Sequence, residues 1–179
     1  MDHRKARVVI DEALFQRIAD GDSKALNDLY ELSYKPIFAL LLSYTQNYQD
    51  AEDLLQETFI KIYQGARLYN PRGNPMAWMM KIARNLFLSS HYHKSGQKIT
   101  NYEELSNQIP FDVILQAEER LLIETMFRML KVEERTVIVL HIIQGFKFRE
   151  ISEILDRPLG SVLSSYHRGL RKLKKAAEE

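Results

Sequence analysis

The side chains with the most informative chemistry share one side of a helix-length segment at residues 75–94. Lys81 and Arg84 are basic, Asn85 carries an amide, and histidine and tyrosine follow on the same side. Cations bind phosphates, planar groups stack on bases and amides bond base edges, so this combination suits a single strand of nucleic acid. An amphipathic helix with a basic C-terminal end would contain the same residues. Taken alone, the segment favours that simpler explanation.

A second set of polar side chains lies near the C-terminus. Residues 148–155 predict a short helix, and the Asp-Arg-Pro sequence after them predicts a turn. A longer helix begins near Leu159, so the segment outlines a helix-turn-helix. The polar side of this longer helix contains Ser161, Ser164, Ser165, Arg168, Arg171, Lys172 and Lys175. Short hydroxyl side chains let a helix approach groove edges, and later cations suit phosphates, so the pattern favours DNA binding over a plain basic hairpin.

Residues 49–65 combine an apolar stripe with an unusual opposite face. The residues whose helical spacing should turn them toward a core are Ala51, Leu54, Leu55, Phe59, Ile62, Tyr63 and Ala66. Ile60 points directly away from them, and its polar neighbours are Asp53, Gln56 and Glu57. Single exposed apolar residues are common, so a solvated face with one isoleucine remains open. The alternative is a docking surface for another protein.

Helical spacing predicts helices throughout the chain. We expect them at residues 12–20, 23–33, 37–46, 50–65, 75–94, 114–130 and 133–144, besides the helix-turn-helix. Asp22, Asp50 and Asn74 are the expected N-caps, and Pro36 should open the third helix. Residues 68–74 are rich in turn formers and should form a loop.

The apolar spacing lapses over residues 95–113, where polar residues, glycine and proline predict a flexible linker. The predicted fold class is therefore all-α, with two small helical domains joined by this linker and the helix-turn-helix in the second. The predicted domains cover residues 1–94 and 114–179.

Composition excludes several classes of protein. The 179 residues include no cysteine, which excludes disulfides and thiolate zinc sites and fits a reducing cytoplasm. The longest apolar run, residues 37–42, is too short to span a bilayer, and no signal peptide is recognisable. We therefore expect a cytoplasmic protein without direct membrane insertion. A net charge of +1 is low for a protein that holds DNA alone, so DNA binding would need a partner.

Catalysis and metal binding have little support in the sequence. Acidic residues lie on helix faces without a matched base, and the sequence contains no glycine-rich phosphate-binding loop. His91 and His93 are two positions apart, so on a helix they point away from each other. We expect no enzyme, no metal site and no cofactor.

Three motifs follow one another in a specific order: DAEDLLQETF at residues 50–59, AWMMKIARN at residues 77–85, and the helix-turn-helix beyond the linker. In that order they resemble the extracytoplasmic-function group of bacterial RNA polymerase sigma factors, over about residues 12–175. The resemblance implies a transcription initiation factor whose partners are core RNA polymerase and promoter DNA. Many relatives are held inactive by an anti-sigma protein, which makes such a protein a further candidate partner.

The resemblance also implies roles for the candidate residues. The surface that grips the clamp helices of the largest polymerase subunit would contain Asp53, Gln56, Glu57 and Ile60. The melted minus-ten strand, with a flipped base in a loop pocket, would be held by Tyr69, Asn70, Arg72, Lys81, Arg84 and Asn85. The tyrosine would stack on the unpaired base. The minus-thirty-five duplex would be read by Ser161, Ser164, Ser165, His167, Arg168, Arg171 and Lys172, with the later cations mainly on phosphates.

This sequence departs from the usual pattern of the group at several positions. Leu163 and Ser165 stand where a lysine and an arginine are common, so the recognition helix is less basic at its start. Asp156 stands where glycine is usual, Lys147 where a helix cap such as serine is usual, and Ser89 where aspartate is usual. None of these departures changes the predicted fold.

Two other functions remain open on the sequence. One is a stand-alone helix-turn-helix transcription regulator with a helical sensor domain, which would bind DNA as a dimer. The other is a helical adaptor without a DNA role. The near-neutral charge, the linker and the outward Ile60 together favour a polymerase subunit. The promoters and the inducing signal cannot be read from these residues.

Overall fold

The computed structural model describes residues 9–71, 73–94 and 129–178, and of residues 91–94 only the backbone. Across these ranges the chain forms helices and no strands, which confirms the all-α prediction. The elements are α1 (Ala13–Ala19), α2 (Ser23–Thr45), α3 (Tyr48–Gly65), the 3₁₀ helix η1 (Ala66–Leu68), α4 (Pro75–Lys94), α7 (Val132–Ile138), the π-helical turn η3 (Val139–Ile143), α8 (Phe148–Leu155) and α9 (Leu159–Ala177). Within these ranges, no helix combines the length and the hydrophobicity that a membrane span requires.

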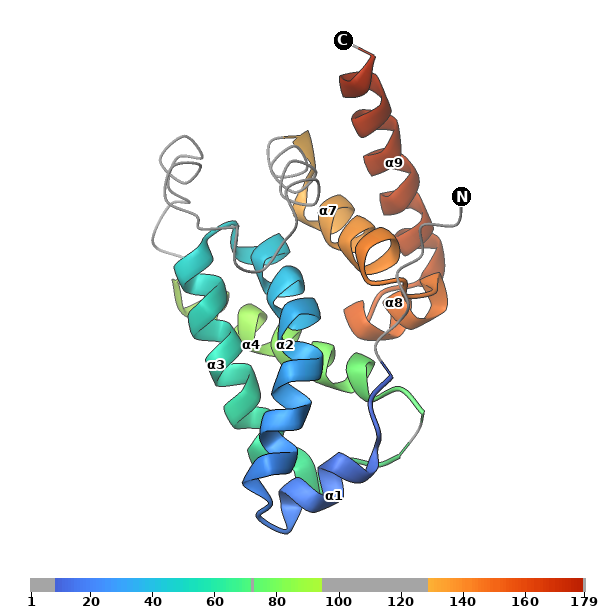
Figure 1. Ribbon diagram of the computed structural model, residues 1–179. Coiled ribbons are helices and arrows are strands. Elements are labelled where there is room, and N and C mark those ends of the chain that lie inside the picture. The colour runs from blue at the N-terminus through green and yellow to red at the C-terminus, as the bar shows by residue number, and fades with distance from the viewer. Residues whose placement is uncertain (1–8, 72, 95–128, 179) are drawn as a thin grey trace.

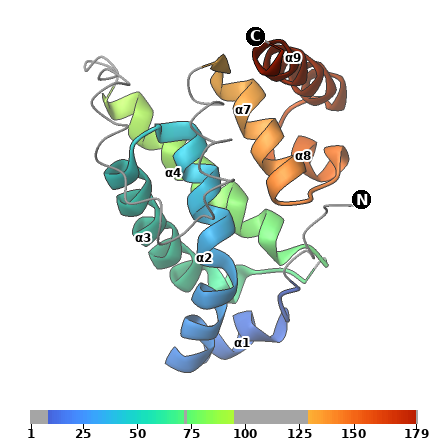
Figure 2. The ribbon, with the colours of Figure 1, turned by 45° about the horizontal axis from the view of Figure 1, so that its top comes forward.

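Helix α2 is central to the arrangement. In Figures 1 and 2 it lies between α3 on one side and the group of α7, α8 and α9 on the other. Helix α4 packs against α2, α3 and α8, and α1 packs against the first half of the molecule through α2 and η1. The buried side chains of both groups of helices form one continuous core.

A single helix, α2, replaces the two helices that the sequence predicted on either side of Pro36. Proline in a helix interior costs about 3 kcal/mol, because it removes a backbone hydrogen bond and crowds the preceding turn. The residues that follow, 37–42, are all buried. Each large apolar side chain that becomes buried contributes about 1.5–3 kcal/mol, so their combined burial outweighs the local preference for a break.

Polar side chains cap the helices near the predicted positions. Asp22 accepts two backbone N–H groups at the start of α2, and Asn74 accepts one at the start of α4, as predicted. At α3 the cap is Asn47, whose Oδ1 accepts the N–H of Asp50 at 3.0 Å. The prediction of Asp50 as the cap was therefore wrong by one turn. Its carboxylate still lies in the first turn, where the helix dipole favours negative charge.

The predicted inner face of α3 and η1 is buried except for one residue. The buried members are Ala51, Leu54, Leu55, Phe59, Ile62 and Ala66. Tyr63 was predicted to join them but is 52% exposed. It lies three residues after Ile60, so it shares the outward side of the helix.

The predicted helix-turn-helix is confirmed. Helix α8 ends at Leu155, and its C-cap, Asp156, has a left-handed φ of 49°. Helix α9 starts at Leu159, after Arg157 and Pro158. The rings of His141, Phe148 and Tyr166 pack together and join η3, α8 and α9. The helix predicted at residues 133–144 corresponds to α7 and η3.

The division into domains at residues 1–94 and 114–179 stays a prediction. The predicted linker at residues 95–113 lies outside the described residues, as does the helix predicted at residues 114–130 apart from its last two positions.

Arg135 of α7 connects the two groups of helices. It is buried, and its Nε donates to the carbonyl of Ser43 at 2.6 Å while its Nη1 donates to that of Leu130 at 3.2 Å. Ser43 lies in the last turn of α2, where carbonyls lack helical partners and the dipole favours a cation. Burial lowers the pKa of Arg135 to about 10, and the Glu133 carboxylate acts in the opposite direction. The guanidinium is therefore charged at neutral pH.

Replacement of Arg135 by alanine should lower the free energy of unfolding by about 1–3 kcal/mol, because buried carbonyl groups lose their donor. Urea denaturation followed by circular dichroism measures this change. Arg149→Ala is the control, since this arginine is exposed on α8 and its loss should change stability by less than about 0.5 kcal/mol. Coincident unfolding curves for the two variants would contradict the structural role of Arg135.

Candidate nucleic-acid and protein interfaces

The predicted docking residues share the outward face of α3. They are Asp53, Gln56, Glu57 and Ile60, all of them exposed, with Ile60 at 55%. Gln49 donates to the Asp53 carboxylate at 3.2 Å, which orders the first turn of this face. Tyr63 adds a second exposed apolar group beside Ile60. This tyrosine was predicted to face the core, although its spacing of three residues from Ile60 also fits the outward side.

Tyr69, which was predicted to stack on an unpaired base, is packed against two aromatic residues. Its ring stacks on that of Phe15 with the centroids 4.1 Å apart, and it meets the ring of Trp78 edge-on at 5.1 Å. One face of the Tyr69 ring is therefore already covered. This packing makes Tyr69 a support for the loop and corrects the expectation of a free stacking platform.

The loop between η1 and α4 is fixed at its C-terminal end. The N–H of Gly73, whose φ is +74°, donates to Oε1 of Glu12 at 2.6 Å. Asn74 follows as the cap of α4. Asn70, a predicted minus-ten contact, is exposed. Arg72, also predicted, lies outside the described residues.

The three predicted contacts on α4 form one patch. Lys81 and Asn85 are one turn apart and exposed, and Arg84 is half-buried. Nη1 of Arg84 lies 3.5 Å from Oδ1 of Asn85. We call these three residues the α4 patch. It brings two cations and an amide together, as the sequence predicted. The side chains of His91 and Tyr92 lie outside the description.

The helix-turn-helix lies close to helix α4. Asn74 donates to Glu150 of α8 at 3.3 Å, near the starts of both helices. Further along, burial raises the pKa of the Tyr44 hydroxyl, while the positive charges of Arg84 and Arg157 act in the opposite direction. Arg84 comes from α4, and Arg157 comes from the turn after α8. Helix α8 therefore packs along α4.

Helix α9 packs on α7 through small side chains. Val162, Ser165 and Gly169 are buried on its inner face. A Cβ on Gly169 would lie 2.6 Å from Cδ1 of Ile138, so the glycine allows a close approach of the two helices. Ser165 was predicted to contact DNA, but its side chain is buried and its Oγ accepts hydrogen bonds from Arg157 and Arg168. Serine is small enough for a tightly packed interface and polar enough for solvent, so the sequence pattern did not distinguish the two.

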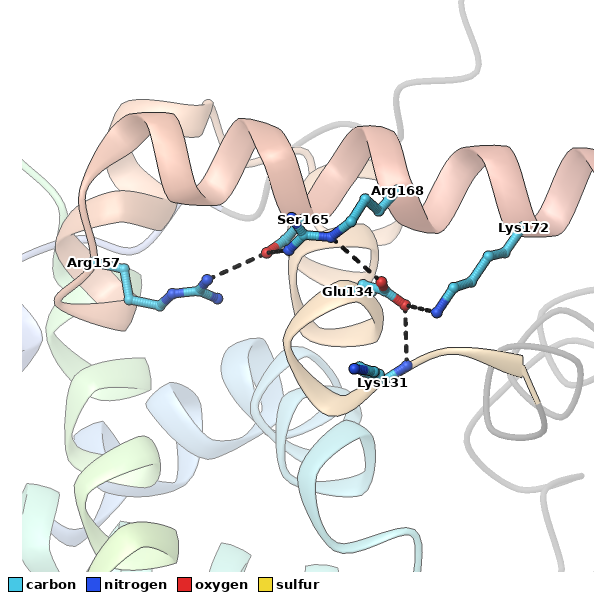
Figure 3. A network of polar contacts seen from close by, with 6 residues as sticks. All are labelled: Lys131, Glu134, Arg157, Ser165, Arg168 and Lys172. Carbon is cyan, nitrogen blue, oxygen red and sulfur yellow. Dashed lines mark hydrogen bonds and ion pairs between the residues drawn. The ribbon is translucent and has the colours of Figure 1, made fainter.

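A network of polar contacts joins α7 to α9 (Figure 3). Glu134 of α7 is buried, and its Oε2 accepts a hydrogen bond from Nζ of Lys172 at 2.7 Å. Its Oε1 lies 3.6 Å from Nε of Arg168. The backbone N–H of Lys131 also donates to Oε2, at 3.1 Å. The two cations predicted to contact phosphates thus bind a carboxylate inside the protein.

Ser165 forms the second part of this network. Its Oγ accepts hydrogen bonds from Nη2 of Arg157 at 3.2 Å and from Nη2 of Arg168 at 3.3 Å. The guanidinium of Arg168 therefore contacts α7 through one nitrogen and its own helix through another. Glu134 was not predicted as a site residue, because its cation partners on α9 lie far away in the chain.

The surroundings of Glu134 favour its ionised form. Burial raises the pKa of this carboxyl, but the hydrogen bonds from Lys172 and from the Lys131 N–H, with the charges of Lys172 and Arg168, together lower it below the ordinary value of 4.5. The carboxylate is therefore charged at neutral pH, as its two ion pairs require.

The outer side of α9 carries the other predicted duplex contacts. Ser164, His167 and Arg171 are exposed, and Ser161 is half-buried at the start of the helix. Lys174 follows three residues after Arg171 and is also exposed. It was not predicted as a contact, although it continues the helical spacing of Ser164, His167 and Arg171. We call the row of Ser164, His167, Arg171 and Lys174 the outer stripe. It presents a hydroxyl, an imidazole and two cations to solvent.

Acid should weaken the contact between α7 and α9. A carboxyl whose pKa is lowered by folding stabilises the protein above its unfolded-state pKa, and this contribution is lost as the pH falls through the folded-state value. The free energy of unfolding should therefore decrease below about pH 4.5, and Glu134→Gln should remove part of that decrease. Urea denaturation across this pH range measures it. Glu133→Gln, which removes a neighbouring exposed carboxylate, is the control, and identical pH dependence in both variants would refute the prediction.

Two family models match the chain in the predicted order. The model described as Sigma-70 region 2 matches residues 29–96, and the model described as Sigma-70, region 4 matches residues 120–173. The first range includes the α3 face and the α4 patch. The second includes α7, α8 and most of α9.

Two solved structures share the fold at 20% sequence identity. One is CnrH in complex with the cytosolic domain of CnrY, with a TM-score of 0.67 and coverage of 94% of this chain and 97% of that one. The other is the sigma factor RpoE in complex with the anti-sigma factor NepR from Bartonella quintana, with a TM-score of 0.66 and coverage of 87% and 98%.

Named relatives align with this chain over nearly its whole length. The ECF RNA polymerase sigma factor SigW of Bacillus subtilis is 28% identical over 173 residues, which cover 89% of this chain and 92% of the relative. The ECF RNA polymerase sigma-E factor of Haemophilus influenzae is 28% identical over 178 residues, which cover 91% and 93%. Because both sigma-70 regions match in order and such relatives align over about nine tenths of their length, the chain belongs to the extracytoplasmic-function group of RNA polymerase sigma factors.

Proposed function

We propose that this sigma factor directs core RNA polymerase to specific promoters in the cytoplasm. Its first domain, residues 1–94, would bind polymerase and capture the melted minus-ten strand, and its second, residues 114–179, would read the minus-thirty-five duplex. The observation that carries the proposal is the outward face of α3, where Ile60 is exposed among carboxylates on a helix whose other side is buried. An apolar centre with a polar rim is typical of protein interfaces. By resemblance to the group, the partner of this α3 face would be the clamp helices of the largest polymerase subunit.

Ile60→Glu should reduce both co-purification with core RNA polymerase and promoter-dependent run-off transcription, because a buried apolar anchor at an interface contributes about 2 kcal/mol or more. Thermal unfolding should change little, since this side chain is exposed. Leu68→Glu is the matched control, because Leu68 is 85% exposed on η1, outside the α3 face. Unchanged binding by the Ile60 variant, or equal loss in both variants, would contradict the assignment of this surface.

The α4 patch and the loop before it support capture of a melted strand. Cations there would bind phosphates and amides would bond base edges. The proposed contacts are Asn70, Arg72, Lys81, Arg84 and Asn85. Tyr69 would act indirectly, since its packing on Phe15 and Trp78 fixes the loop that carries the first two contacts.

The outer stripe supports duplex recognition by α9. A helix in the major groove uses short polar side chains at base edges and longer cations at the phosphates beside them. Ser161 and Ser164 lie in the first two turns of α9 and are the proposed base-edge contacts. Arg171 and Lys174 follow on the exposed side and are the proposed phosphate contacts, with His167 between the two groups.

Arg171→Ala should weaken the binding of promoter duplex by polymerase that carries the variant. The slope of log affinity against log salt should become shallower by about 0.9, which corresponds to one phosphate contact. Fluorescence anisotropy over a series of salt concentrations measures the slope. Lys24→Ala, which removes an exposed cation from the start of α2, should keep the wild-type slope. A wild-type slope in the Arg171 variant would remove this residue from the proposed contacts.

An anti-sigma protein is a further proposed partner. RpoE was solved in complex with the anti-sigma factor NepR, and CnrH in complex with the cytosolic domain of CnrY. A comparable protein would regulate this chain by covering the α3 face, the α4 patch or the outer stripe.

A further inference from the structure

We propose that Glu134 is a positioning residue for the DNA-binding helix α9. Its carboxylate holds Arg168 and Lys172 against α7 and keeps both cations from phosphate contacts. The outer stripe then makes the contacts with the duplex. This inference rests on the proposed function of α9 in promoter recognition. The basic residues of α9 then form two groups: Arg168 and Lys172 bind Glu134, and Arg171 and Lys174 face solvent.

The position of Glu134 suits this role. Its side chain is only 4% exposed, and its two oxygens are shared between the cations, Oε1 with Arg168 and Oε2 with Lys172. The Lys131 N–H fixes the same carboxylate at the start of α7. In Figure 3 both α9 side chains extend from their helix toward this carboxylate.

The packing of α9 brings the two cations within reach of Glu134. Gly169 lies between them in the sequence, and a Cβ at this position would stand 3.4 Å from Cβ of Glu134. The same Cβ would lie 2.6 Å from Cδ1 of Ile138, so the Ile138 side chain would have to shift to admit a larger residue. Ser165 holds Arg168 from a second direction. The orientation of this guanidinium is therefore fixed by two different elements.

The carboxylate, more than burial, restrains these cations. The side chains of Arg168 and Lys172 are 55% and 39% exposed, so solvent reaches both. Their release to DNA would leave a buried carboxylate without a cation beside it, which is strongly unfavourable. A phosphate contact at a surface, in contrast, is weakened by salt. Glu134 thereby limits attraction to DNA of any sequence.

Glu134→Gln and Glu133→Gln form a matched pair of variants, because the two residues are adjacent and each change removes one negative charge. Only the first should release Arg168 and Lys172. On a heparin column, which offers a polyanion without base sequence, the full chain with Glu134→Gln should elute at higher salt than the chain with Glu133→Gln. Equal elution would overturn the proposal, whether or not the chain binds polymerase.

The same pair, assembled with core RNA polymerase, tests the consequence for DNA. On a duplex with a scrambled minus-thirty-five sequence, Glu134→Gln should steepen the salt slope by about 0.9 for each additional phosphate that α9 neutralises, or about 1.8 for two. The ratio of promoter to scrambled affinity should fall. A slope no steeper than that of Glu133→Gln would overturn the DNA role. Failure of the wild-type chain to bind polymerase would instead reject the proposed function, and the heparin result would still decide whether Glu134 restrains the cations.

Single changes on α9 keep the proposal testable if circular dichroism shows that Glu134→Gln does not fold. Arg168→Met and Lys172→Met each leave Glu134 with one cation partner. Neither change should make the salt slope on promoter duplex shallower, whereas Arg171→Met should. A slope shallower by about 0.9 in either of the first two variants would mean that the residue binds phosphate, and would overturn the proposal.

Discussion

The second half of α2 is apolar on every side, and the arrangement of the other helices follows from the need to cover it. Residues 37–42 are buried, with α3 and α4 packed on the helix from the first part of the chain and α7 and η3 from the second. The end of α2 also has carbonyl groups without helical partners, and Arg135 supplies a charged donor there. This one apolar run therefore determines where the helices that carry the α3 face, the α4 patch and the outer stripe meet.

The sequence correctly predicted the elements for which the local residue pattern and the packing of the folded protein favour the same conformation. The outward Ile60, the cap at Asn74 and the turn after α8 all follow from residue types within a few positions of one another. Pro36 was different, because its local effect favours a break and only the burial of the following residues keeps the helix continuous. Tyr63 was assigned to the wrong face of α3, because an amphipathic phenol ring can lie either on the buried face or on the exposed face of a helix. Such residues are decided by neighbours that lie far away in the chain.

The site residues show the same limit. Tyr69 lies among turn formers, and nothing within its loop indicates that Phe15 covers the ring. Ser165 suits a groove-facing position as well as a close helix contact, and the position of α7 decides between them. Glu133 and Glu134 both fit the first turn of a helix by the dipole argument, although one is exposed and the other buried. Residue type and periodicity predicted which helices carry the candidate residues, while the packing of α9 on α7 determined which side chains face outward.

The charge distribution now connects fold and function. Membership of the sigma group decides against the stand-alone regulator and the adaptor, and the net charge of +1 is in keeping with a subunit that binds DNA together with polymerase. Attraction to DNA of any sequence grows with the number of cations that can reach phosphates. Helix α9 carries a dense series of cations, but two of them bind Glu134. When Arg168 and Lys172 stay bound to Glu134 in the presence of DNA, their charges stabilise the packing of α9 on α7. The same two charges then add no attraction to the phosphates that every duplex carries. Discrimination then depends on the outer stripe, where the side chains that can read base edges lie.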